Sequence, residues 1–156
     1  MRWLECRVPP PLVGLLCAVL MLALQRHAPL GALPPGVLRV AHWLLWPLLL
    51  LALLLDGSAV LSFIRRHTTV NPLRPQNSST LVLEGFYRLS RNPMYLGMLC
   101  LLLGWALWLG DWVTLAGPLL FGLWIDRFQI RPEERALAAR FGDDYLAYCR
   151  RVRRWL

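Results

Sequence analysis

The stretch that decides the fold runs from Asn92 to Ile125 and reads NPMYLGMLCLLLGWALWLGDWVTLAGPLLFGLWI. It holds two apolar runs, Met94–Leu109 and Trp112–Ile125, separated only by Gly110-Asp111. A two-residue break of this kind returns the second helix antiparallel to the first. Asparagine is a preferred N-cap and proline a preferred first helical residue, so the first helix is expected to begin at Pro93. The stretch therefore predicts a tight helical hairpin.

Two further apolar runs lie upstream, Leu12–Leu24 and Ala41–Phe63. Hydrophobic residues make up 57% of the chain and the mean hydropathy is +0.47, above the roughly 45–50% apolar content of a soluble domain. The first and last of the four runs are shorter than the ~20 residues that a spanning helix needs, although their flanks can extend them. We therefore predict an all-α, polytopic membrane bundle of about four transmembrane helices.

The first run has one alternative interpretation. Arg2 and Arg7 precede its apolar core, as in a signal peptide. However, Gln25-Arg26-His27 follow the run directly, where a signal peptide would have a cleavage site of small residues. A spanning helix is the preferred interpretation.

The length of 156 residues favours a single integral-membrane domain, residues 1–156. Residues 1–64 would form the two N-terminal spans. Residues 65–156 would form a polar loop, the hairpin and C-terminal interfacial helices. Turn-forming residues are dense in the loop from Arg65 to Arg91, which also carries a short apolar segment, Leu81-Val82-Leu83.

The positive charge predicts an orientation. All 17 basic side chains are arginines, and with four spans only Arg26 and Arg39 fall on one side. The positive-inside rule then places both termini and the long loop in the cytoplasm, at a bacterial-type inner membrane. The arginines are better explained by this orientation and by membrane lipids than by nucleic acid. Cysteines and histidines show no spacing typical of metal ligands, so no metal site is predicted.

Asp56 lies well inside the second span. An intramembrane carboxylate is a functional candidate by default. The preferred interpretation is that it faces a neighbouring helix or pairs with a loop arginine such as Arg65 or Arg66. A transporter-like module would rest only on Asp56 and on Pro47 in the same span, without any internal repeat.

The C-terminal segment predicts an amphipathic interfacial helix that is broken near Gly142. Its apolar residues fall three or four apart, namely Leu137, Phe141, Tyr145, Tyr148, Val152 and Trp155. Pro132-Glu133-Glu134 has the composition of a helix start, because proline suits the first position and acidic side chains complement the helix dipole. We therefore expect a new helix to begin at Pro132.

Two separated motifs together resemble the isoprenylcysteine carboxyl methyltransferase family, which is related to membrane phospholipid methyltransferases. The segment Leu81–Gly97 is similar to the pattern L-V-x-x-G-x-Y-x-x-x-R-H-P-x-Y-x-G. The segment Glu133–Val152 is similar to E-E-x-x-L-x-x-x-F-G-x-x-Y-x-x-Y-x-x-x-V. The resemblance covers the chain from Thr80 onward, and it is specific only because both motifs are present.

The resemblance implies an integral-membrane methyltransferase that uses S-adenosylmethionine. By motif position, catalytic roles would fall to Arg91, Asn92 and Glu134. The cofactor-binding residues would be Leu81, Val82, Tyr87, Asn92, Pro93, Met94, Tyr95 and Glu133. The acceptor would be a lipophilic small molecule or a lipid.

The chain departs from the family pattern at two positions. The family's histidine before proline is Asn92 here, and an arginine four residues before the first glutamate is Gln129. Arg127 or Arg131 could substitute for that arginine, so Gln129 and Arg131 are the candidate substrate residues. Asn92 cannot act as a base, which favours an acceptor that is already anionic, such as a carboxylate. The alternative is a non-catalytic membrane scaffold or accessory subunit that keeps the fold.

Overall fold

The structure is a computed structural model that describes residues 2–65, 81 and 83–156, without the side chains of residues 2 and 62–65. Most of the predicted polar loop, residues 66–80, lies outside the described residues, as does Val82. The elements in chain order are η1 (Arg2–Leu4), α1 (Pro10–His27), α2 (Pro35–Arg65), η3 (Gly85–Arg88), α3 (Pro93–Leu109), η4 (Trp112–Leu115), α4 (Ala116–Ile125), η5 (Asp126–Ile130) and α5 (Arg131–Arg151). Within these residues the only β pairing is an isolated bridge between Ala32 and Asp111. The all-α prediction is confirmed.

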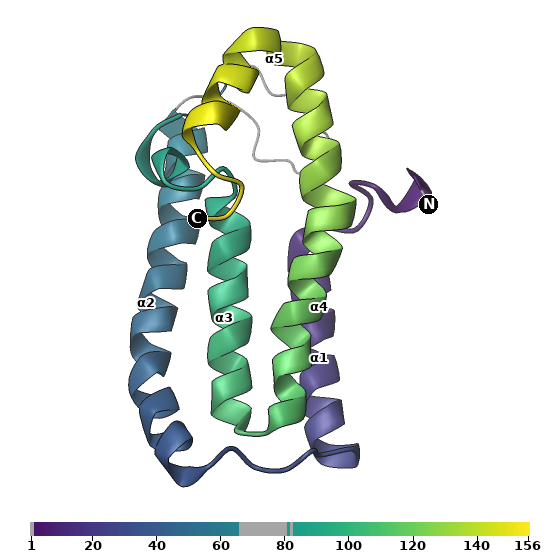
Figure 1. Ribbon diagram of the computed structural model, residues 1–156, viewed down its shortest axis with the longest axis vertical. Coiled ribbons are helices and arrows are strands. Elements are labelled where there is room, and N and C mark those ends of the chain that lie inside the picture. Colours follow the sequence, from purple (N-terminus) through teal and green to yellow (C-terminus); the bar gives the residue numbers. More distant parts are fainter. Residues whose placement is uncertain (1, 66–80, 82) are drawn as a thin grey trace.

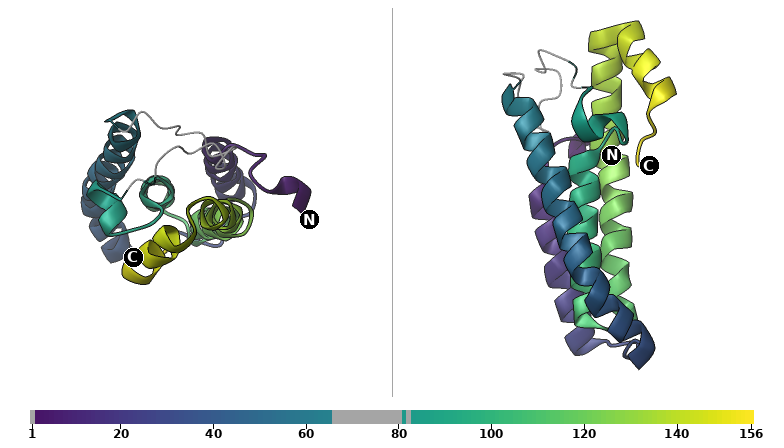
Figure 2. Two further views of the ribbon diagram at one scale, coloured as in Figure 1. Left: turned by 90° about the horizontal axis from the view of Figure 1, so that it is seen from above. Right: turned by 90° about the vertical axis from the view of Figure 1, so that its left-hand side faces the viewer.

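Helix α3 is the central element of the bundle (Figures 1 and 2). It packs against α2 on one side and against α1 and α4 on the other. Buried side chains from α1, α3 and α4 form one core cluster, which contains Met21, Leu102 and Phe121. Helix α2 contacts the rest of the described structure mainly through α3 and η3.

The predicted hairpin is present, and one carboxylate organises its tip. Helix α3 ends at Leu109 and Gly110 adopts a left-handed conformation with φ 70°. The Asp111 side chain caps η4 by accepting a hydrogen bond from the Val113 amide at 2.9 Å. The same carboxylate accepts the amides of Leu30 and Gly31 at 3.1 and 3.2 Å. Asp111 thus joins the hairpin tip to the connection between α1 and α2.

Two of the helices, α1 and α2, are long and apolar enough to cross a membrane, and α3 is a shorter apolar helix. Large apolar side chains point outward from α2, including Trp43, Trp46 and Leu53, which are 77%, 71% and 70% exposed. Such a surface suits an apolar surrounding. The fourth predicted span, residues 112–125, is divided between η4 and α4 and continues into α5.

Helix α5 begins at Arg131 with Pro132, Glu133 and Glu134 in its first turn, close to the predicted start, but no break separates it from the preceding helix. The backbone of Ile125, Asp126, Ile130 and Arg131 is right-handed helical, and α4 runs through the π-helical turn η5 into α5 (Figure 1). Proline has no amide N–H, so inside a helix it cannot donate to the carbonyl four residues before it. A π-helical turn changes the hydrogen-bond pattern locally. The Phe128 carbonyl, four residues before Pro132, accepts the Cys6 amide at 3.0 Å.

The predicted break at Gly142 is present, with φ 51° and ψ −126°. Beyond it α5 turns back toward the start of α3 (Figure 1). The apolar stripe of α5 packs against protein. Tyr145, Tyr148 and Val152 form a buried cluster, which also includes other residues of the stripe and two residues of the short apolar segment in the polar loop, Leu81 and Leu83. Trp155 departs from the stripe and packs against the core of α1, α3 and α4.

Asp56 faces α3 at a point of very close contact. A Cβ atom built at Gly97 would lie 2.8 Å from Cγ of Asp56. Oδ1 of Asp56 is buried and has no hydrogen-bond partner among the described residues. Arg65 and Arg66 are the predicted partners of Asp56 in the loop. The side chain of Arg65 and the whole of Arg66 lie outside the described part of the structure. Gly97 is therefore the position that lets α2 approach α3.

This contact predicts that Gly97→Ala will destabilise the fold, since the added methyl group meets the Asp56 carboxyl on the facing helix. Overpacking of this kind costs about 1–3 kcal/mol of unfolding free energy. Thermal or denaturant unfolding in detergent measures the loss.

Gly57→Ala is the matched control, because a Cβ at Gly57 has nothing within 4 Å. It should change stability by no more than about 1 kcal/mol, since alanine is the better helix former. In the background of Asp56→Ala, the change at Gly97 should become nearly neutral. Equal losses in both backgrounds would contradict the assignment of the contact.

Candidate functional site

The predicted site residues that the structure describes lie at one end of the bundle, where α3 begins and α4 continues into α5 (Figure 1). The contributing segments are η3, the residues just before α3, the first turn of α3, η5, the first turn of α5, and the tail, which we define as residues 152–156. The tail returns the C-terminus to the start of α3 (Figure 1). Residues that are far apart in sequence therefore meet around two neighbouring carboxylates, Glu133 and Glu134.

Glu133 accepts two hydrogen bonds on the same oxygen. The Tyr95 hydroxyl donates to Oε1 at 2.7 Å, and Nε2 of Gln129 donates to Oε1 at 2.6 Å. Gln129 and Glu133 lie four residues apart, so one helix face presents both. Tyr95 is buried in the first turn of α3. Both hydrogen bonds use Oε1, and neither occupies Oε2 of Glu133.

The surroundings of Glu133 hold its carboxyl close to half-protonation at neutral pH. Burial raises the pKa of Glu133 to about 7, because the ionised form loses its hydration. The hydrogen bonds from Gln129 and Tyr95 oppose this rise, and the neighbouring charge of Glu134 adds to it. Burial also raises the pKa of Tyr87 well above its usual value, so its phenol stays neutral.

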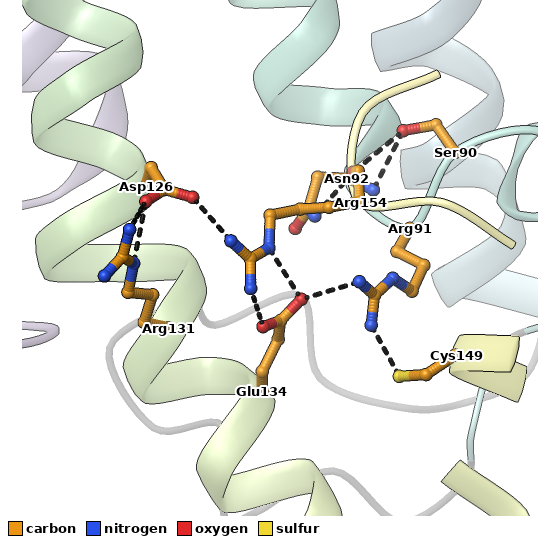
Figure 3. Close-up of polar contacts among 8 residues, drawn as sticks. All are labelled: Ser90, Arg91, Asn92, Asp126, Arg131, Glu134, Cys149 and Arg154. Atoms are coloured by element: carbon orange, nitrogen blue, oxygen red, sulfur yellow. Dashed lines mark hydrogen bonds and ion pairs between the residues drawn. The ribbon is translucent and has the colours of Figure 1, made fainter. Parts of the chain in front are cut away.

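Glu134 is held by two arginines (Figure 3). Arg154 reaches it in a two-pronged contact, Nε to Oε1 at 3.0 Å and Nη2 to Oε2 at 2.6 Å. Arg91 adds a contact from Nη2 to Oε1 at 3.2 Å. Planar bidentate pairs are the stronger kind of arginine–carboxylate contact. The predicted residues Arg91 and Glu134 are therefore brought together directly.

The network continues outward from Arg154 to Arg131 (Figure 3). Nη1 of Arg154 lies 3.0 Å from Oδ1 of Asp126, and the other oxygen of Asp126 accepts Arg131 at 2.7 and 2.8 Å. The Arg131 side chain is about half exposed, at 52%. Of the two candidate substrate residues, Gln129 is thus engaged with Glu133, while Arg131 lies at the outer end of the network.

Asn92 stands at the N-cap position of α3, but its side chain makes no cap, contrary to expectation. Its amide Nδ2 donates instead to the carbonyl of Arg154 at 2.9 Å. The Asn92 backbone amide donates to Oγ of Ser90 at 3.1 Å. The residue that replaces the family's histidine therefore joins the start of α3 to the tail.

The remaining predicted cofactor residues surround the same region. Pro93 is buried and Met94 is half-buried at the start of α3. The carbonyl of Tyr87 accepts the Tyr148 hydroxyl at 2.7 Å, and Leu81 packs beside Tyr148 in the apolar cluster. Val82 lies outside the described residues.

The sequence interpretation missed Arg154, Asp126 and Cys149. Arg91 donates from Nη1 to the Cys149 sulfur, while its Nε is buried and has no partner in the described part of the chain. Arg154 is one of four arginines among the last seven residues, and nothing local distinguishes it. Only its contacts identify it.

The arrangement suits a polar ligand that has both donors and acceptors. Oε2 of Glu133 can accept from hydroxyl or ammonium groups, and Nε of Arg91 can donate to a carboxylate. Among the described residues, no three His, Cys, Asp or Glu side chains are placed to hold a metal ion.

Comparison with known proteins adds one family and one relative. Residues 40–144 match the phospholipid methyltransferase family. That segment includes Tyr95, Glu133 and Glu134 and ends before the tail. The chain is also similar to an uncharacterized protein of Haemophilus influenzae, with 49% identity over 63 residues, which are 40% of this chain and 100% of that protein. No solved structure matches the chain significantly.

The raised pKa of Glu133 predicts a pH-dependent stability. The folded protein binds this proton more tightly than the unfolded chain, whose glutamate titrates near 4.5. The contribution is therefore fully present below pH 4.5 and is lost as pH rises through about 7. The loss should amount to roughly 3 kcal/mol of unfolding free energy. Unfolding in detergent across this pH range measures it.

Glu133→Gln should flatten this pH dependence, because glutamine does not titrate. Asp144→Asn is the matched control, since Asp144 is an exposed carboxylate on the same helix. That variant should keep the wild-type slope. A wild-type slope in Glu133→Gln would show that another group is responsible.

Proposed function

The chain belongs to the phospholipid methyltransferase family, and from this we propose that it is an integral-membrane, S-adenosylmethionine-dependent methyltransferase whose site is built around Glu133. One observation carries the proposal. The hydrogen bond between Tyr95 and Glu133, which are 38 residues apart in sequence, joins the two motifs at the point where α3 begins. Two motifs that meet in one cluster support a shared role better than either does alone.

The residues fit the cofactor in their chemistry. S-Adenosylmethionine carries ribose hydroxyls and an ammonium group as donors and a carboxylate as acceptor. Glu133 would hold the donors through Oε2, and Arg91 would hold the carboxylate through Nε. Tyr87, Pro93 and Met94 would enclose the cofactor together with Leu81 and Val82. When bound, the cofactor supplies a methyl group on a positively charged sulfur.

The protein's own contribution is mainly orientation and exclusion of water. Tyr95 and Gln129 hold the Glu133 carboxylate in one orientation, and Arg91 and Arg154 do the same for Glu134. Side chains held in this way lose little freedom when a ligand binds, which favours binding in a reactive geometry.

For the acceptor we propose a lipophilic molecule with an anionic group, of the isoprenylcysteine carboxyl methyltransferase type. Asn92 and Gln129 carry no titrating nitrogen, so neither can remove a proton from an amine. A carboxylate needs no such step. The family description favours a lipid as the molecule that carries this group. Arg131 would meet its charge from the exposed edge of the site.

We further propose that the chain is one domain in a bacterial inner membrane, with both termini cytoplasmic. Arg26 and Arg39 lie at the far end of α1 and at the start of α2, away from the site. The arginines of α5 and the tail lie at the site end (Figure 1). This distribution follows the positive-inside rule.

A second candidate function is a membrane scaffold that binds the cofactor without turnover. The engagement of the Asn92 amide by the tail favours it, because the position that is histidine in the family pattern has a structural contact here. This candidate gains if the cofactor binds while no methyl group reaches any acceptor.

The purified protein in detergent should bind S-adenosylmethionine, and Glu133→Ala and Tyr95→Ala should each weaken that binding at least about tenfold, or ~1.4 kcal/mol. Both changes remove the hydrogen bond that joins the motifs. Equilibrium binding of radiolabelled cofactor gives the Kd.

Asp144→Asn again serves as the control, since it removes a carboxylate from the same helix outside the site, and its Kd should equal that of the wild type. Unchanged binding in both site variants would refute the placement of the cofactor. Absence of binding to the wild-type protein would refute the activity.

The acceptor class is tested by incubating the protein with methyl-labelled cofactor and a native lipid extract. A methyl ester releases its label as volatile methanol in mild alkali, whereas an N-methyl group does not. We expect volatile label that depends on the protein. Label that stays with the lipid after alkali would contradict a carboxylate as the acceptor.

A further inference from the structure

The tail contributes hydrogen-bond acceptors to the segment just before α3. The Arg91 amide donates to the Arg153 carbonyl at 3.0 Å. The Arg154 carbonyl accepts Nδ2 of Asn92 at 2.9 Å and Oγ of Ser90 at 3.4 Å. Three consecutive residues that lead into α3 are thus joined to two consecutive residues of the tail.

The same tail residue also holds the acidic side chains of the long helix. The Arg154 guanidinium contacts both oxygens of Glu134 and one oxygen of Asp126 (Figure 3). Its backbone holds the start of α3 while its side chain holds η5 and α5. Arg154 is therefore a direct connection between the two segments that carry the two motifs.

Arg91 depends on this connection through Glu134. Oε1 of Glu134 is shared between Nη2 of Arg91, at 3.2 Å, and Nε of Arg154, at 3.0 Å. Without Arg154, the half-buried Glu134 carboxylate would keep one of its two cationic partners. The backbone of Arg91 would also lose its partner if the tail detached.

We propose that Arg154 is a positioning residue for cofactor binding: through Glu134 and the backbone of the tail it sets the orientation of Arg91 and Asn92. This inference rests on the proposed function. The tail lies beyond residues 40–144, the segment that matches the family. The positioning role is thus assigned by this chain's own contacts.

A simple surface ion pair would contribute little to the stability of the protein. The contact at Arg154 differs in two respects. Its side chain is 34% exposed and that of Glu134 only 18%, and the contact is two-pronged with a further carboxylate at Asp126. Arg153 offers a direct comparison, because its side chain is exposed and only its carbonyl contacts the segment before α3.

Amide hydrogen exchange of the full chain in detergent tests the connection without any cofactor. In Arg154→Gln, the Arg91 amide should exchange at least about tenfold faster, since the tail that accepts its hydrogen bond opens more often. Arg153→Gln, the matched control with the same loss of charge, should leave that exchange unchanged. Amides of α1 should be unaffected in both variants, which shows that the fold is intact.

Cofactor affinity tests the consequence. Arg154→Gln should raise the Kd for S-adenosylmethionine about tenfold, and Arg153→Gln should raise it less than about twofold. Arg154→Lys keeps the charge but not the planar guanidinium, so its Kd should fall between those of the two glutamine variants. An unchanged exchange rate at Arg91 in Arg154→Gln would overturn the inference. Faster exchange with unchanged affinity would overturn the positioning role.

Amide exchange and cofactor affinity distinguish a failure of the contact at Arg154 from a failure of the proposed function. If the wild-type protein binds no cofactor, the proposed function and the positioning role fall together. Exchange at Arg91 would still show whether Arg154 holds the segment before α3.

Discussion

The structure at the site end depends on satisfying two adjacent carboxylates, Glu133 and Glu134, that are partly removed from water. A carboxylate in such a place is costly unless hydrogen bonds or counter-charges replace its hydration. Glu133 obtains its partners from α3 and from its own helix, and Glu134 obtains them from the segment before α3 and from the tail. Each set of partners joins segments that are distant in sequence, so the contacts that satisfy the two carboxylates also bring the parts of the site together.

The unbroken helix from α4 into α5 makes this possible. If the helix broke at Pro132, the direction of Glu133 and Glu134 would depend on the orientation of a separate helix. The π-helical turn η5 instead carries the helix through, which places Gln129 and Glu133 on one face toward Tyr95. Single π-helical turns are frequent at functional sites because they alter which side chains share a face. At the opposite end, Asp111 plays the simpler role of holding the loops together.

The site combines contacts inside the segment that matches the family with contacts outside it. The cluster around Glu133 uses residues of the family pattern and lies inside the matched segment. The tail lies outside that segment, and it engages Asn92, one of the two positions where the chain departs from the pattern. A hydrogen-bonding amide at this position suits the contact, because its N–H group always donates, whereas a histidine nitrogen does so only in one tautomer.

The sequence by itself determined the helical hairpin and the break at Gly142. These features follow from local chemistry: apolar runs, turn residues, and a glycine in a backbone conformation that other residues rarely adopt. Tertiary structure alone decided that the helix continues through Pro132, that Asn92 bonds the tail, and that Arg154, among several similar arginines, holds both Glu134 and Asp126. Local sequence could not predict these contacts, because each depends on which distant group lies within about 3 Å, a distance set by packing of the whole bundle.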